Sequence, residues 1–412
     1  MSSGEPGSSS SPEDRRRATL VRVLAIVAVL VLIEGMSYIG LWALPRVAGV
    51  RAPRTAAIFR DQTTRIETYF AREAGGRDQL DPELGWRYRA GYGREGDRIN
   101  SQGLRSERDY APTAAPDVVR VAAFGDSFVY GNEVDTKDAW SSAVERLHPN
   151  IELLNYGVGG YGDDQAYLRF AREGLTYHPR MVILGFTPDD LRRLTNVYRR
   201  FIDDREFAWT KPRFRLGPNG ALTLMPPPIH DSAGLDRLRG DPKMAIGFGE
   251  HDQWFQPWTY RNPLYDYSAA VRLLTVLGGR VHRKALDSNR LVKGAEFNPA
   301  SEAFGLQVAI SQRFADDARA AQATSAVVML PDKESVRMAR AGKRVVYAPL
   351  TDSLRARGIQ VIDTAEEFAR AGADADVDGW FAPGGHYSPR GNEIVARMVG
   401  REILAHAGQR PQ

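Results

Sequence analysis

The sequence predicts an α/β fold, a three-layer sandwich built on a mainly parallel sheet. After residue 117, short apolar segments alternate with amphipathic ones, which is typical of parallel strands connected by helices that cover both faces of a sheet. A long apolar segment lies near the N-terminus, and the alternation stops in the middle of the chain. We therefore also expect an anchor helix and an insertion into the sheet domain.

Five apolar segments are the expected strands of this sheet. They are residues 118–124, 151–155, 181–186, 325–330 and 359–363. The amphipathic segments between and after them predict helices near 140–147 and 163–177 and a closing helix that begins around Ser388. Ser388 followed by Pro389 is a favourable pair for the N-cap and the first turn of that helix.

The N-terminal region is expected to anchor the protein in a membrane. Residues 1–17 are rich in Ser, Gly and Pro and predict a disordered tail. Residues 18–45 form the predicted transmembrane helix, because the apolar run at 23–44 has 22 residues. At about 1.5 Å per residue it covers roughly 33 Å, enough to cross a hydrocarbon core of about 30 Å. It is longer than the apolar region of a cleavable signal peptide, about 7–15 residues; the alternative is a buried core helix.

The orientation of this span follows from the arginines that flank it. Four precede it and three follow it: Arg15, Arg16, Arg17 and Arg22, then Arg46, Arg51 and Arg54. The positive-inside rule then favours a cytoplasmic N-terminus. Glu34 lies well inside the span, and either contacts a partner helix or is a carboxyl group that tolerates partial hydration.

The rest of the chain is expected to be a stalk and one domain. Residues 46–80 are the predicted stalk, and residues 81–412 the domain, interrupted by an insertion at about 196–309. An Asn-Gly turn at 219–220 between two short apolar segments predicts a hairpin in this insertion. Its aromatic residues either shape a substrate cleft or form the insertion's own small core: Trp254, Phe255, Trp258, Tyr260, Tyr265 and Tyr267.

Composition excludes several kinds of partner and chemistry. The 55 Lys and Arg residues nearly balance 51 Asp and Glu residues, and the net charge of +4 comes without a basic block, so no nucleic-acid partner is indicated. The absence of cysteine excludes disulfides and thiolate sites. The seven histidines are scattered singly and no phosphate-binding glycine motif is present, so we expect neither a metal nor a cofactor.

Polar residues that follow the strands are the candidate functional residues, because ligands bind beyond the carboxyl ends of the strands in such sheets. Gly-Asp-Ser follows the first strand and puts Ser127 at its end. A glycine-rich loop at 155–165 follows the second and opens a helix, where backbone N–H groups can approach a ligand. Asp189 and Asp190 follow the third strand, and His386 precedes the closing helix.

In this order, these blocks resemble the SGNH, or GDSL-type, hydrolase family. The resemblance covers residues 81–412 apart from the insertion, and the segments at 81–86, 99–105 and 160–165, "DPELGW", "INSQGLR" and "GYGDDQ", look like its membrane-anchored bacterial branch. It implies acyl transfer through a covalent ester, with Ser127 as nucleophile and His386 as its base. It also implies an oxyanion hole made by the backbone N–H groups of Ser127 and Gly160.

Two positions depart from the family's pattern. The third oxyanion donor is normally an Asn, but that place holds Asp189, and an ionised carboxylate cannot donate a hydrogen bond. Either Asp189 is protonated, or it points away, or another donor such as Asn155 substitutes. The family's acid precedes the histidine by two or three residues, where this chain has Gly384 and Pro383. The candidates to orient His386 are then Asp363, Asp376 and Asp378, or a backbone carbonyl.

These features lead to one main hypothesis and two alternatives. The first is a single-pass membrane esterase or deacylase, with a periplasmic or extracytoplasmic catalytic domain, that acts on O-acyl groups, acetyl above all, of an envelope glycan or lipid. The second is an O-acyltransferase on a cell-envelope polysaccharide that uses the same acyl-enzyme. The third is a catalytically weakened glycan-binding protein, which the two departures and the aromatic insertion favour.

Overall fold

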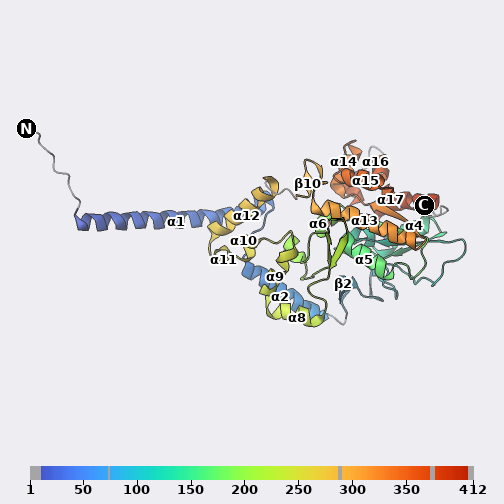
Figure 1. Ribbon diagram of the computed structural model, residues 1–412, viewed down its shortest axis with the longest axis horizontal. Coiled ribbons are helices and arrows are strands. Elements are labelled where there is room, and N and C mark those ends of the chain that lie inside the picture. Colours follow the sequence, from blue (N-terminus) through green and yellow to red (C-terminus); the bar gives the residue numbers. More distant parts are fainter. Residues whose placement is uncertain (1–10, 73–74, 286–289, 372–375, 407–412) are drawn as a thin grey trace, which may run out of the picture. The chain divides into compact units, whose positions relative to one another are not determined.

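The computed structural model describes residues 11–72, 75–285, 290–371 and 376–406. The chain divides into two compact units. The helical unit consists of Met1–Arg60 and Gln256–Leu286, and the sheet unit of Asp61–Phe255 and Asp287–Gln412. Figure 1 shows the elements of both. The expected insertion at 196–309 is thus divided between the two units.

A five-stranded parallel sheet forms the centre of the sheet unit, in the order β6-β5-β7-β12-β13. The strands are β5 (Val119–Phe124), β6 (Ile151–Asn155), β7 (Met181–Phe186), β12 (Thr324–Met329) and β13 (Val361–Asp363). In chain order this is 2-1-3-4-5, the flavodoxin-like arrangement, in which ligands bind where the strand order reverses. The predicted α/β fold with a parallel sheet is confirmed, and every predicted strand is present to within two residues at each end.

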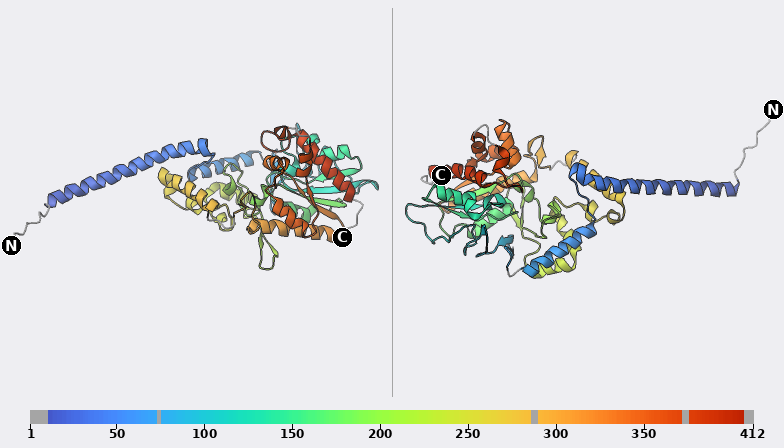
Figure 2. Two further views of the ribbon diagram at one scale, coloured as in Figure 1. Left: turned by 90° about the horizontal axis from the view of Figure 1, so that it is seen from above. Right: turned by 180° about the vertical axis from the view of Figure 1, so that it is seen from behind.

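Helices cover both faces of this sheet, as Figure 2 shows. Alternate residues of β5 enter separate apolar clusters, Val121 and Ala123 on one face and Ala122 and Phe124 on the other. Helices α4 (Trp140–Leu147) and α17 (Pro389–His406) pack on the first face. Helices α5 (Asp163–Glu173) and α13 (Glu302–Ala320) pack on the second. The period of two along the strand thus produces the three layers.

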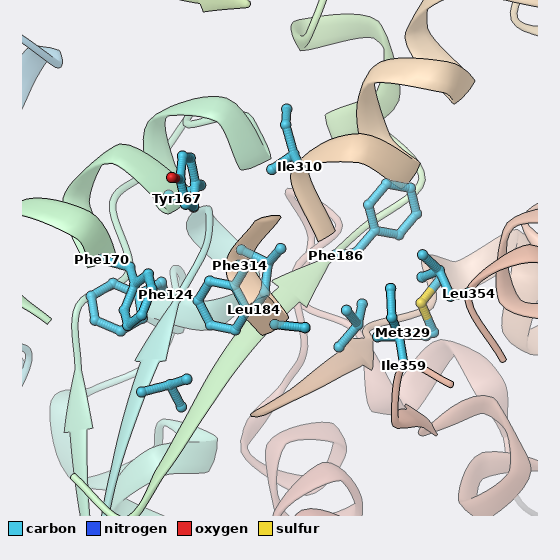
Figure 3. Close-up of a cluster of buried hydrophobic side chains, with 14 of the residues drawn as sticks. Phe124, Tyr167, Phe170, Leu184, Phe186, Ile310, Phe314, Met329, Leu354 and Ile359 are labelled. Carbon is cyan, nitrogen blue, oxygen red and sulfur yellow. The ribbon is translucent and has the colours of Figure 1, made fainter. Parts of the chain in front are cut away.

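The cluster on the second face contains large aromatic side chains from several elements, shown in Figure 3. Phe124 stacks on Tyr156 with ring centroids 4.6 Å apart and meets Phe170 edge-on at 5.6 Å. Phe170 in turn contacts Phe314 of α13 at 4.6 Å. These rings fix β5, α5 and α13 relative to one another and so hold the carboxyl end of β5 in place.

The other elements of the sheet unit are short. They are β1 (Asp78–Asp81), β2 (Gly85–Tyr88), β3 (Gly93–Arg94), β4 (Asp97–Arg98), α3 (Ser127–Tyr130), α6 (Asp190–Arg193), α7 (Arg199–Ile202), β8 (Arg213–Leu216), β9 (Leu222–Met225), α8 (Ser232–Gly240), α9 (Ala245–Phe248), β10 (Val292–Lys293), β11 (Glu296–Phe297), α14 (Lys333–Arg340), α15 (Ala348–Arg355), α16 (Ala365–Arg370) and four 3₁₀ turns. Strands β8 and β9 pair antiparallel, which confirms the hairpin predicted from the Asn-Gly turn.

The helical unit contains α1 (Pro12–Ala48), the first part of α2 (Thr55–Arg72), α10 (Pro257–Tyr260), α11 (Leu264–Tyr267) and α12 (Ala269–Ala285). Helix α1 is long and apolar enough to cross a membrane. It begins at Pro12, so it includes the end of the tail expected at 1–17; residues 1–10 of that tail lie outside the described residues. The expected stalk at 46–80 contains the end of α1, all of α2 and most of β1.

Glu34 of α1 caps helix α12 of the same chain. Its carboxylate accepts hydrogen bonds from the Ser268 hydroxyl at 2.8 Å and from the backbone N–H groups of Ala269 and Ala270. A carboxylate at a helix N-terminus satisfies free N–H groups and interacts favourably with the helix dipole. The sequence offered a partner helix or hydration as partners for Glu34; in the structure the partner is the chain's own α12.

Candidate active site

Ser127 stands at the carboxyl end of β5 and starts the one-turn helix α3. Asp126 is the N-cap, and its carboxylate accepts the Phe128 N–H at 2.8 Å. Gly125 permits the turn because β7 and α3 approach it closely: a methyl group there would lie 2.7 Å from the Gly185 carbonyl oxygen and 2.4 Å from the Val129 side chain. The serine hydroxyl is therefore held by backbone geometry at the edge of the sheet.

Three side chains form a chain of hydrogen bonds at this edge. The Oγ of Ser127 lies 2.9 Å from Nε2 of His386, and Nδ1 of the same ring lies 2.6 Å from Oε2 of Glu133. The nucleophile, base and acid of a serine hydrolase have this connectivity, in which the acid fixes the tautomer and orientation of the ring. The structure thus brings Ser127 and His386 together as the sequence predicted and adds Glu133.

Glu133 was missed by the sequence analysis, although it belongs to the segment that carries the serine. Its backbone φ is 67°, in the left-handed region that residues other than glycine rarely adopt. Its carboxylate also accepts the backbone N–H groups of Gly384, at 2.6 Å, and His386, at 3.0 Å. The only sequence signal was an acidic residue six positions after the serine.

The carboxylate of Glu133 occupies the space that a side chain at position 384 would fill. A methyl group on Gly384 would lie 2.5–2.6 Å from the carboxylate atoms of Glu133. Position 384 is one of the two positions at which the resembled family carries its acid. A side chain at position 384 and the carboxylate of Glu133 therefore cannot occupy this space together.

Glu133 stays ionised over a wide pH range. Partial burial raises the pKa of its carboxyl group, but the hydrogen bonds from the backbone N–H and ring of His386 and from Gly384 outweigh burial. The pKa is consequently below its ordinary value. A carboxylate in this state can stabilise the imidazolium that forms when His386 takes a proton.

The three acids expected near His386 have other partners. Asp363 accepts a hydrogen bond from the Tyr347 hydroxyl at 2.9 Å. Asp378 pairs with Lys333 at 2.6 Å and Arg337 at 2.7 Å, and Asp376 accepts the Asp378 N–H. The expectation that one of them orients His386 is corrected, because Glu133 takes the Nδ1 position.

The backbone N–H groups of Ser127 and Gly160 are candidate oxyanion donors. Neither donates to an acceptor within the part of the chain that the structure describes. Gly160 has φ of +81°, which glycine adopts without strain. The loop is braced from β2: the Gly159 N–H donates to the Tyr88 hydroxyl at 2.8 Å, and the Trp86 indole donates to the Gly159 carbonyl at 3.2 Å.

Asp189 and Asn155 are not free to act as the third donor. Asp189 pairs with Arg192 at 2.6 Å and with Arg193 at 2.7 Å. Burial raises the pKa of Asp189, but the charges of Arg193 and Arg192 outweigh it, so the pKa is below its ordinary value and the group is ionised. Both protons of the Asn155 amide are used, by the Val129 carbonyl at 2.8 Å and the Ser141 hydroxyl at 2.9 Å.

A buried ion network lies behind the serine. Arg193 donates to Asp126 at 2.9 Å, to Asp190 at 2.6 Å and to the Tyr161 carbonyl at 2.8 Å. Burial, and then the charge of Asp126, raises the pKa of Asp190 well above its ordinary value. Arg193 thus connects the end of β7, the glycine loop and the residue beside Ser127.

Ser127 and His386 open into a cleft of about 1310 Å³ that lies within the sheet unit. Six aromatic residues line it: Tyr69, Trp86, Tyr88, Tyr92, Phe207 and Trp209. The aromatic residues expected to shape a cleft, from Trp254 to Tyr267, do not line it. Tyr265 is buried within the helical unit, and Phe255 packs on Phe201 at 5.0 Å. Among the described residues no cluster of three or more His, Asp or Glu side chains is arranged to hold a metal.

No protein-family model and no curated protein matches the chain. Similar solved structures include a member of the lipolytic protein G-D-S-L family from Veillonella parvula, 12% identical, with 70% of this chain and 100% of that chain covered at a TM-score of 0.32. The lipase/acylhydrolase from Enterococcus faecalis is 12% identical, with coverage of 72% and 99% and a TM-score of 0.33. The acetyl xylan esterase AlAXEase is 11% identical, with coverage of 69% and 100% and a TM-score of 0.35. We draw the function from the geometry of the site and not from these similarities.

Proposed function

We propose that this protein is a serine esterase or deacylase that cleaves O-acyl esters through an acyl-enzyme. The observation that carries the proposal is the hydrogen-bonded chain from Ser127 through His386 to Glu133, with distances of 2.9 and 2.6 Å, at the wall of a cleft. It supplies a nucleophile, a base and an orienting carboxylate in the order that acyl transfer requires.

The reaction has two half-reactions. Ser127 Oγ attacks the ester carbonyl while its proton passes to Nε2 of His386, and the negative charge on the carbonyl oxygen is held by the N–H groups of Ser127 and Gly160. Collapse breaks the ester bond, and His386 returns the proton to the leaving alcohol. Water then attacks the acyl-enzyme by the same path in reverse, which releases the carboxylic acid and the free serine.

The substrate class we propose is an O-acylated, above all O-acetylated, glycan or lipid of the cell envelope. The volume and the aromatic lining of the cleft support a sugar-sized ligand, since six aromatic residues, Trp86 and Trp209 among them, line its wall. Helix α1 supports a membrane location. In this proposal residues 18–45 span the cytoplasmic membrane, the N-terminus is cytoplasmic and the sheet unit is periplasmic or extracytoplasmic.

Glu133 also weakens the case for a binding protein without activity. That hypothesis depended in part on the lack of an acid for His386, and Glu133 provides one at 2.6 Å. An O-acyltransferase uses the same acyl-enzyme and differs only in the acceptor. It is therefore an outcome that the products distinguish.

The test is covalent labelling of the full chain in detergent micelles with a fluorophosphonate probe. We expect labelling of the wild type, loss of labelling in Ser127→Ala, and retention in the control Ser232→Ala, whose serine is exposed at the start of α8. Hydrolysis of a chromogenic acetyl ester should fall by a factor of about 10⁶ in Ser127→Ala. A wild type that resists the probe, or labelling independent of Ser127, would refute the proposal. Acetylated sugar among the products would identify a transferase.

A further inference from the structure

Arg199 is a buried cation at the wall of the cleft whose charge is only partly paired. It begins α7 and is 2% exposed. Its Nη2 donates to Glu206 at 3.0 Å, but its Nη1 has no acceptor among the residues that the structure describes. A guanidinium group keeps its charge at every physiological pH, and an unsatisfied buried donor costs about 1–3 kcal/mol, or more when it is charged. Such a group is expected to have a partner in the working state.

The position of Arg199 relates it directly to the reacting atoms. A methyl group placed on Gly160 would lie 3.6 Å from Nη2 of Arg199 and 3.5 Å from the ring of Trp86. Arg199, Gly160, Ser127 and His386 all line the same cleft. The guanidinium group of Arg199 therefore lies beside the glycine loop, where a substrate must lie to reach Ser127.

The cleft also has cationic side chains that are not paired. Six arginines line it, of which Arg65, Arg77 and Arg193 form ion pairs with carboxylates. Neither Arg72 nor Arg94 has an ion pair within the described ranges, and both are exposed. Exposed arginines of this kind at the cleft attract anionic ligands to it.

We propose that the alcohol part of the substrate carries an anionic oxygen group, a carboxylate or a phosphate, and that the guanidinium group of Arg199 binds this group beside the scissile ester. This inference rests on the proposed function and names the substrate class of that site: an acidic O-acylated molecule, such as a glycan with uronic acid residues. Arg72 and Arg94 attract the rest of an acidic chain to the cleft. The aromatic wall contacts the sugar rings.

The test compares two substrates that differ only in charge. They are O-acetylated glucuronic acid and its methyl ester at the carboxyl group. A third substrate, an O-acetylated sugar phosphate, distinguishes recognition of a carboxylate from recognition of a phosphate. We expect the full-length wild type to prefer one of the anionic substrates over the neutral methyl ester by about tenfold or more in kcat/KM, chiefly through KM. In Arg199→Gln this preference should fall towards one, while the control Arg205→Gln, whose arginine pairs with Asp203 outside the cleft, should retain it.

Two further measurements make a failure interpretable. Calorimetric titration of Ser127→Ala with unacetylated oligoglucuronate or with the sugar phosphate measures binding without catalysis, and adding Arg199→Gln should weaken it about tenfold. Arg199→Lys, which keeps the charge, should retain part of the affinity if Arg199→Gln does not fold. Ser127-dependent hydrolysis without any preference for an anion would overturn this inference alone. An equal loss of kcat on charged and neutral esters in Arg199→Gln would also overturn it, because Arg199 would then act on the reaction's own oxyanion. Anion binding that depends on Arg199 in a chain without esterase activity would overturn the proposed function but support the anion-binding site at Arg199.

Discussion

Glu133 and Gly384 together explain how this site has an acid, although the chain has none at the positions where the resembled family carries it. Glu133 lies six residues after Ser127, in the left-handed conformation, and its carboxylate fills the space beside Gly384. Three donors hold it: two backbone N–H groups and the ring of His386. The carboxylate of Glu133 thus reaches the space beside Gly384 from a segment that is distant in the sequence.

This arrangement predicts that the acid can be transferred from position 133 to position 384. Glu133→Gln should lower kcat by roughly 10²–10⁴-fold, because the neutral amide cannot stabilise the imidazolium or fix the tautomer. Glu133→Ala combined with Gly384→Asp should recover at least tenfold of the activity lost in Glu133→Ala, because the new carboxylate enters the vacated space. The measurement is steady-state hydrolysis of a chromogenic acetyl ester. Gly384→Asp alone should be inactive, since the two carboxylates would collide; an active single variant would contradict the explanation.

The lowered pKa of Glu133 predicts the direction of a pH effect on stability. The folded-state pKa lies below the unfolded value of about 4.5, so the folded state favours the ionised form. Its contribution to the free energy of unfolding is full above the unfolded pKa and is lost as the pH falls through the folded pKa. The difference in Tm between wild type and Glu133→Gln should therefore shrink as the pH falls below about 4.5. A difference that grows as the pH falls below this value would show the opposite sign.

At the scale of elements, Asn155 connects the end of β6 to α3, the helix that begins at Ser127, and to the glycine loop. Its amide donates to the Val129 carbonyl in α3 and to Ser141 in α4, and its side-chain oxygen accepts the Gly157 N–H at 2.9 Å. One buried side chain therefore joins the two segments that carry Ser127 and Gly160.

Asn155→Ala should lower the free energy of unfolding by about 1–3 kcal/mol, because it leaves the Gly157 N–H group without its acceptor and removes the two hydrogen bonds that the amide donates. Activity should fall as well, since the two oxyanion donors lose their common support. Thermal and urea unfolding measure the first effect, and kcat on an acetyl ester the second. Asn150→Ala, at an exposed position just before β6, is the control and should change neither. A stable, fully active Asn155→Ala would show that the connection is dispensable.

At the scale of the whole molecule, the division into a helical unit and a sheet unit separates the proposed anchor from the proposed catalysis. The helical unit contains α1, the one helix among the described residues that is long and apolar enough to span a membrane. The sheet unit contains Ser127, Glu133 and His386 and the whole cleft.

The proposed topology can be tested because the chain has no cysteine. Ser11→Cys and Ser232→Cys each introduce a single thiol, before the apolar part of α1 and on the surface of the sheet unit. In spheroplasts, a membrane-impermeant maleimide should label Ser232→Cys and should reach Ser11→Cys only after lysis. The reverse pattern would place the sheet unit in the cytoplasm, and equal labelling of both in spheroplasts would rule out a single span between them.

The sequence alone was sufficient for the parts that depend on neighbouring residues. The strands β5, β6 and β7 are short and mostly apolar segments, the hairpin is encoded by its Asn-Gly turn, and the long apolar helix by the composition of one segment. Ser127 and His386 could be chosen because both stand at the ends of such segments. Their catalytic roles remain predictions that the labelling experiment tests.

Only the tertiary structure decided the features that depend on contacts between distant residues. Glu133 meets His386 across 253 positions, and Glu34 caps a helix more than 230 positions away. Asp189 is excluded as a donor because it pairs with Arg192 and Arg193. The sequence alone does not determine which way these arginine side chains point. The unpaired Nη1 of Arg199 is visible only once its surroundings are packed. Local patterns determine where strands and turns form, whereas the direction of a side chain and the identity of its partner follow from how those elements pack.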